Sequence, residues 1–142
     1  MVELKNKLKP CEIFLIEDNK DDVFLISLAI KECQINGNIQ TANNGKTAID
    51  ILKEKVKSNK KLPDLIILDI NLPRITGLEV LKEIKLEEST SFIPTVVFTS
   101  SDSTSDMNYS YKNGADLFIK KPNNINDFKK IMSYIKAQFL EN

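Results

Sequence analysis

The stretch LPDLIILDINLPRITGLEV, residues 62–80, decides the fold. Its centre, residues 65–68, is a run of four apolar side chains, which is typical of a short strand buried on both faces of a sheet. The run ends at Asp69, and a loop marked by proline and glycine follows. From Gly77 the apolar spacing predicts an amphipathic helix over residues 77–88. The stretch is therefore a strand, a loop and a helix, with an acid at the carboxyl end of the strand.

The same unit recurs along the whole chain. Each connection between successive strands contains a helix and is long enough to cross over the sheet. The next strand can therefore run parallel to the one before it, with the usual right-handed crossover. We therefore expect a doubly wound α/β sandwich formed by residues 1–142 as a single domain. The other strands are predicted at residues 12–16, 38–42, 92–98 and 116–120, and the other helices at 21–34, 46–58, 101–113 and 125–139, the third of these with many residues of poor helix propensity.

Composition excludes several classes of function. The chain has 142 residues, with 20 basic and 20 acidic side chains. Its net charge is therefore zero and does not indicate binding to nucleic acid or to an acidic membrane. It contains no histidine, which excludes histidine metal ligands, a Ser-His-Asp triad and a phosphohistidine within this chain. No apolar stretch is long enough to cross a bilayer, and Cys11 and Cys33 lack a paired spacing. We expect a cytoplasmic protein with reduced thiols.

Five polar residues follow or end the predicted strands. Glu17 and Asp18 end the first strand, Asp69 the third, Thr99 the fourth and Lys121 the fifth. Ligands of doubly wound sheets gather beyond the carboxyl ends of the strands, so these side chains are expected to converge. Three carboxylates brought together repel one another unless a cation neutralises them, and hard oxygen ligands favour Mg²⁺. The pattern predicts a magnesium site.

The same set suits phosphoryl transfer. A lysine and a threonine supply a cation and a hydroxyl donor for phosphoryl oxygens, and the Asp69 carboxylate can act as the nucleophile that forms an acyl phosphate. A pair of catalytic acids for glycoside hydrolysis is the alternative. The chain has few aromatic residues and no evident sugar groove, which weighs against that alternative.

Four motifs together resemble the receiver domains of two-component signalling. The resemblance covers about residues 8–140 and implies a flavodoxin-like fold, (βα)5, with strand order 2-1-3-4-5. The loop before the third strand resembles that of small stand-alone regulators that partner phytochrome-type or other histidine kinases. The motifs are LIEDN (15–19), LIILDINLPRITG (65–77), VVFTSS (96–101) and GADLFIKKP (114–122).

The resemblance implies a metal site and a phosphoacceptor. Glu17, Asp18 and Asp69 would bind Mg²⁺ with the backbone carbonyl of Asn71, and Asp69 would receive the phosphoryl group. Glu17 stands where many receivers have aspartate, a common variation that leaves metal binding intact. Asn71 and Ser101 occupy positions that tune hydrolysis of the acyl phosphate in this family.

The resemblance also implies how phosphorylation is detected. Lys121 and Thr99 would contact the phosphoryl oxygens, and Thr99 with Phe118 would form the switch pair. Lys121 is chosen over Lys120 because it directly precedes Pro122, where receivers often have a cis peptide bond. The altered surface is expected over residues 101–113, the fifth strand and the last helix.

The implied partners are a sensor histidine kinase, a downstream target or phosphotransfer protein, and a second copy bound through that surface. The receiver would catalyse its own Mg²⁺-dependent phosphorylation and dephosphorylation, without being a metabolic enzyme. The second hypothesis is an aspartyl-phosphate phosphatase or phosphotransferase, but Asn71 stands where that class has a second aspartate. The third is an interaction module of the same fold that is not phosphorylated.

Overall fold

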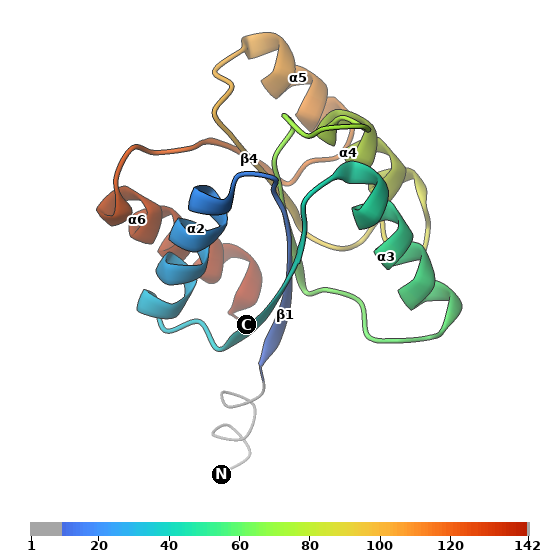
Figure 1. Ribbon diagram of the computed structural model, residues 1–142, viewed down its shortest axis with the longest axis horizontal. Coiled ribbons are helices and arrows are strands. Elements are labelled where there is room, and N and C mark those ends of the chain that lie inside the picture. The colour runs from blue at the N-terminus through green and yellow to red at the C-terminus, as the bar shows by residue number, and fades with distance from the viewer. Residues whose placement is uncertain (1–9, 142) are drawn as a thin grey trace.

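The computed structural model describes residues 10–141 and contains one five-stranded sheet between two layers of helices. Figure 1 shows α2 and α6 on one side of the sheet, and α3 and α4 on the other. The strands are β1 (Cys11–Ile16), β2 (Gly37–Ala42), β3 (Leu65–Leu68), β4 (Thr95–Thr99) and β5 (Leu117–Lys120). The helices are α2 (Lys20–Glu32), α3 (Gly45–Lys57), α4 (Gly77–Leu86), α5 (Thr104–Lys112) and α6 (Ile125–Ile135), followed by a π-helical turn, η1 (Lys136–Leu140).

The strand order is β2-β1-β3-β4-β5, and every neighbouring pair is parallel. The predicted fold and strand order are confirmed. In the register of the sheet, Ile16 of β1 pairs with Leu68 of β3, and Thr99 of β4 pairs with Lys120 of β5. The carboxyl ends of β1, β3, β4 and β5 therefore lie at one edge of the sheet. The residues that directly follow these strands meet at this edge.

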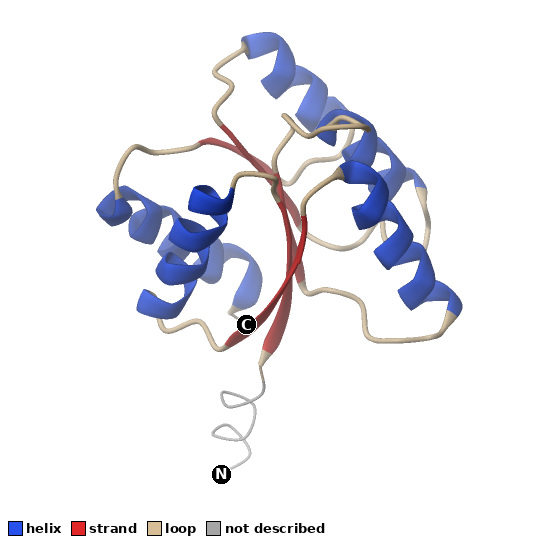
Figure 2. Cartoon of the chain, viewed as in Figure 1, coloured by secondary structure: helices blue, strands red, loops and turns tan. Residues whose placement is uncertain are grey.

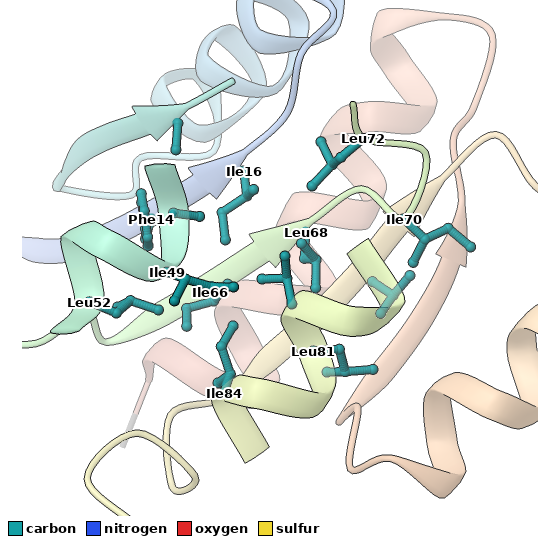
Figure 3. Close-up of a cluster of buried hydrophobic side chains, with 14 of the residues drawn as sticks. Phe14, Ile16, Ile49, Leu52, Ile66, Leu68, Ile70, Leu72, Leu81 and Ile84 are labelled. Atoms are coloured by element: carbon teal, nitrogen blue, oxygen red, sulfur yellow. The ribbon is translucent and has the colours of Figure 1, made fainter. Parts of the chain in front are cut away.

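Apolar side chains fill the space on both faces of the sheet. Successive residues of a strand point to opposite faces, so Ile66 and Leu68 pack toward α3 and α4, whereas Leu65 and Ile67 pack toward α2 and α6. Figure 2 shows the helical layers on the two sides of the strands, and Figure 3 shows the cluster on the α3 and α4 side. This burial on both faces explains why residues 13–16 of β1 and all of β3 are continuous apolar runs.

A side-chain cap begins each α-helix. The capping oxygen accepts a hydrogen bond from the backbone N–H three residues later, which satisfies one of the free donors of the first turn. These caps place the helix starts at the carboxyl edge of the sheet, next to the strand ends. The capping residues are Asn19, Asn44, Thr76, Ser103 and Asn124.

Three boundaries differ from the sequence prediction by three residues or more, and the first is the start of α5, which lies at Thr104 and not at residue 101. The fourth strand begins at Thr95, not at Phe92, because the chain turns over residues 90–93, where the N–H of Ile93 donates to the carbonyl of Thr90. The last helix was expected to continue to residue 139, but it becomes π-helical at Lys136. None of the helices described between residues 10 and 141 has the length and hydropathy needed to span a bilayer.

Candidate phosphoryl-transfer site

Backbone hydrogen bonds extend the sheet pattern past the strand ends and hold the polar residues in place. The N–H of Asp69 donates to the carbonyl of Ile16 at 3.0 Å, and the N–H of Lys121 donates to the carbonyl of Thr99 at 2.7 Å. Asp69 therefore lies beside the end of β1, and Lys121 lies beside the end of β4. The structure brings the strand-end residues together as the sequence predicted.

An acidic cluster forms where β1 and β3 end. One carboxylate oxygen from each of Glu17, Asp18 and Asp69 lies within 4.8 Å of the others. Glu17 and Asp69 are buried, whereas Asp18 is exposed. Three oxygen donors at this spacing can share one hard cation such as Mg²⁺ or Mn²⁺, with solvent access on the Asp18 side.

Lys121 lies among these acids. Its ammonium nitrogen is 2.7 Å from Oε1 of Glu17, 2.8 Å from Oδ2 of Asp22 and 2.9 Å from Oδ2 of Asp69. The Lys121 side chain is only 9% exposed. A buried ammonium group needs partners of opposite charge, and the three carboxylates supply them.

The pKa values of the three buried groups follow from this arrangement. Burial, reinforced by the charge of Asp69, raises the pKa of Glu17 to about 7 even though Lys121 opposes the shift. Burial also acts to raise the pKa of Asp69, but hydrogen bonds from the N–H of Asn71 and from Lys121 outweigh it and lower that pKa. Burial acts to lower the pKa of Lys121, but its three carboxylate partners raise it overall. Asp69 is therefore the more acidic of the two buried carboxyl groups.

Asp22 is a member of the site that the sequence analysis missed. The side chain of Asn19 caps α2 by accepting from the N–H of Asp22 at 3.0 Å, which fixes Asp22 in the first turn, where it contacts Lys121. The expected position of that turn, at the same edge of the sheet as Lys121, was the signal that could have identified it.

Polar contacts link Asp69 to β4. The N–H of Asn71 donates to Oδ1 of Asp69 at 3.0 Å, and its side-chain amide donates to the hydroxyl oxygen of Thr99 at 3.4 Å. The N–H of Ser101 donates to the same oxygen at 3.3 Å, and the Ser101 hydroxyl donates to Asp106 of α5 at 2.6 Å. Thr99 is fully buried. A continuous polar path therefore runs from Asp69 to α5.

The loop after Asp69 is held against α4 by a close approach at Gly77. A Cβ atom at this position would lie 2.2 Å from the carbonyl oxygen of Asp69 and 2.3 Å from Cα of Ile70. Only glycine allows this approach, so Gly77 sets the path of the backbone that carries Asp69. The peptide bond before Pro122, expected to be cis, is trans: the structure has no cis peptide bond in residues 10–141.

Phe118 lies in β5, half-buried against the core cluster on the α3 and α4 side. It pairs with Val97, two residues before Thr99. Its backbone N–H donates to the hydroxyl oxygen of Tyr111 in α5 at 3.0 Å. Because β5 is an edge strand, this bond satisfies a backbone donor that the sheet leaves open and joins α5 to the strand.

Comparisons with known proteins agree with this geometry. The family model of the response regulator receiver domain matches residues 13–133. The probable methanogenesis regulatory protein FilR2 of Methanothrix harundinacea is 35% identical over 131 residues, which are 92% of this chain and 84% of that protein. The response regulator Rcp1 of Synechocystis sp. is 34% identical over 133 residues, covering 93% of this chain and 90% of Rcp1.

Solved structures are also similar. The phosphorylated cyanobacterial phytochrome response regulator RcpA superimposes with a TM-score of 0.85 at 34% identity, over 94% of this chain and 96% of RcpA. The Mn²⁺-bound form of Rcp1 gives a TM-score of 0.83 at the same identity and the same coverage. Of these two similar structures, that of RcpA is phosphorylated and that of Rcp1 contains a bound divalent metal ion.

Proposed function

Because the chain belongs to the response regulator receiver family of two-component signalling, we propose that Asp69 is its phosphoacceptor and that a partner sensor histidine kinase is the donor. The observation that carries the proposal is that Asp69 belongs to the acidic cluster and lies 2.9 Å from the ammonium nitrogen of Lys121. Glu17 shares this position, but its pKa is raised, whereas that of Asp69 is lowered. An ionised carboxylate next to a fixed cation is suited to attack an electrophilic phosphorus atom.

In the proposed step, a carboxylate oxygen of Asp69 attacks the phosphorus atom of a phosphohistidine on the kinase. The new O–P bond forms as the N–P bond breaks, and the imidazole nitrogen leaves with the electron pair. Lys121 and the Thr99 hydroxyl would contact the peripheral phosphoryl oxygens. Such transfers depend mainly on positioning and on stabilisation of charge, which the fixed lysine provides.

We assign Mg²⁺ as the ion of the acidic cluster. Glu17, Asp18 and Asp69 would hold it with the backbone carbonyl of Asn71, and the raised pKa of Glu17 supports the assignment, since it marks a buried negative charge that lacks full compensation. Bound Mg²⁺ neutralises charge on the phosphoryl oxygens. The Mn²⁺-bound form of Rcp1 supports divalent metal binding in this family.

The output of the proposed switch is binding to another protein. A downstream target, a phosphotransfer protein or a second copy would recognise the surface formed by α5, β5 and α6. The polar path from Thr99 through Ser101 to Asp106 supports this choice because it ends on α5.

Intact-protein mass spectrometry after incubation with acetyl phosphate and Mg²⁺ tests the phosphoacceptor. We expect one added phosphoryl group on the wild type and none on Asp69→Asn. Asp102→Asn is the matched control, because Asp102 lies at the same edge of the sheet with a side chain 81% exposed, outside the cluster. Unchanged labelling of Asp69→Asn would overturn the assignment of the nucleophile.

A further inference from the structure

A groove between α3 and α4 lies away from the phosphoryl-transfer site. Its volume is about 470 Å³, and its floor includes Ile49, Leu52 and Ile84, which Figure 3 shows between the two helices. The lining residues extend to the last turns of both helices, whereas the acidic cluster lies near the helix starts. A ligand of this groove would therefore not obstruct Asp69.

The rim of the groove exposes apolar side chains. Leu86, the last residue of α4, is 75% exposed, and Val56 near the end of α3 is 37% exposed. Isolated apolar side chains on a surface are ordinary, but here they border an apolar depression. Covering both with another surface would remove them from water, which favours association.

Charges on the two sides of the groove are opposite in sign and matched in spacing. Lys53 and Lys57 of α3 line one side, and Glu83 of α4 and Glu87, which caps the end of that helix, line the other, with the members of each pair four residues apart. All four are exposed, and none of them forms an ion pair with any residue described in the range 10–141. Glu87 accepts a hydrogen bond from the N–H of Ser89, at 3.2 Å, which is not a charged partner, so the four charges can still pair with charges of another molecule.

We propose that this groove is a self-association surface, and that its occupant is the same face of a second copy of this chain. A twofold axis parallel to the helices places the lysine side of one copy over the glutamate side of the other, twice per dimer. A twofold axis across the helices would place like charges together. The charge pattern therefore selects one dimer geometry and opposes the other.

Rotation about the twofold axis parallel to the helices also brings the apolar side chains at the rims of the two grooves together. Leu86 and Val56 lie near the ends of their helices and line the same groove. In the selected geometry, Leu86 of each copy lies over the Val56 side of the other groove. This association uses a different surface from α5, β5 and α6, so it depends neither on phosphorylation nor on the proposed function.

Sedimentation velocity over a range of protein concentrations, at low salt and without Mg²⁺ or a phosphate mimic, tests the proposal. We expect reversible self-association that weakens as salt is added, because the charges at the rim of the groove are exposed and salt screens them. The variants Lys53→Glu/Lys57→Glu and Glu83→Lys/Glu87→Lys should each weaken it by roughly ten- to a hundredfold, since every attractive rim pair becomes repulsive. An equimolar mixture of these two variants should associate again, because one face is then negative and the other positive.

Two controls separate this surface from general charge effects. Lys82→Glu/Lys112→Glu changes the net charge equally at exposed positions that do not line the groove, and it should associate as the wild type does. Leu86→Gln should weaken both the wild-type dimer and the mixed dimer. A wild type that stays monomeric up to near-millimolar concentration would overturn the proposal and leave the groove to a helix of another protein. A mixture that does not associate would also overturn it.

Discussion

Oε1 of Glu17 lies 2.7 Å from the ammonium nitrogen of Lys121, and both side chains are almost inaccessible to solvent. The pair joins the end of β1 to the end of β5 across the carboxyl edge of the sheet. Burial disfavours the ionised form of Glu17, and Lys121, which shares its charge among three carboxylates, compensates it only partly, so the pKa of Glu17 is raised.

This pKa predicts a pH-dependent stability of the metal-free protein. A carboxyl group with a pKa raised from 4.5 to about 7 binds its proton more tightly in the folded state. Its stabilising effect is complete below the unfolded pKa and is lost as the pH rises through the folded pKa. In EDTA, we expect the free energy of unfolding to fall by ~3 kcal/mol as the pH rises through the two pKa values. The lowered pKa of Asp69 acts with the opposite sign and at lower pH.

Urea unfolding at several pH values, with and without Mg²⁺, measures this effect. Glu17→Gln should abolish most of the slope, and Mg²⁺ should reduce it in the wild type, because metal binding favours the ionised carboxylate. Glu54→Gln, an exposed change on α3, should keep the slope. An equal slope in Glu17→Gln and the wild type would contradict the interpretation of the buried pair.

A second prediction concerns Asp18, the exposed member of the acidic cluster. Asp18→Ala should weaken Mg²⁺ binding by at least ~10-fold, because it removes one charged ligand of a small, strongly hydrated cation. Titration calorimetry measures the affinity. Asp21→Ala, also exposed but outside the cluster, is the control and should bind nearly as well as the wild type. Unchanged affinity in Asp18→Ala would exclude this cluster as the magnesium site.

Strand-end residues could be predicted from the sequence because two simple rules combine. Buried parallel strands read as apolar runs, and the carboxyl ends of such strands share an edge, so Glu17, Asp69 and Thr99 had to lie near one another. The roles assigned to these residues rest on the family resemblance and stay predictions. Their convergence is a property of the fold, and the structure confirms it.

Other features depend on contacts that no local pattern encodes. Asp22 contacts Lys121 across 99 positions of sequence. The expected helix start places both residues at the same edge of the sheet, but the contact itself depends on the folded distance between α2 and the end of β5. The sequence prediction began β4 too early, because Phe92 and Ile93 extend the apolar run. The backbone at these residues forms a turn. The π-helical turn at Lys136 likewise has no signal in the apolar spacing.

A third prediction tests the approach at Gly77. Gly77→Ala should destabilise the protein by about 1–3 kcal/mol, because the added methyl group meets backbone atoms that cannot move independently. Gly37→Ala is the control, since its added Cβ would meet first the end of the Ile13 side chain at 3.1 Å. Urea unfolding compares the two. Equal stability of both variants would contradict the claim that Gly77 sets the backbone path at Asp69.

The last prediction concerns transmission from Asp69 to α5. The buried hydroxyl oxygen of Thr99 accepts hydrogen bonds from the Asn71 side chain and the Ser101 backbone, and Ser101 contacts Asp106 of α5. A phosphoryl group on Asp69 would compete for the Thr99 hydroxyl through a charge-assisted hydrogen bond. Movement of Thr99 would change the packing available to Phe118, which is joined to α5 through Tyr111. We expect coupling of ~1–3 kcal/mol between the two ends of this path.

Amide exchange with and without beryllofluoride, a phosphate mimic, measures that coupling. In the wild type the mimic should change exchange over α5 and β5, because α5 buries little apolar surface and contains residues of poor helix propensity. Thr99→Ala should still be labelled at Asp69 but should lose most of this response. Thr99→Ser keeps the hydroxyl group and should retain the response, which separates the role of the hydrogen bond from that of packing. A full response in Thr99→Ala would show that the signal reaches α5 without the Thr99 hydroxyl, and no response in the wild type would contradict the switch itself.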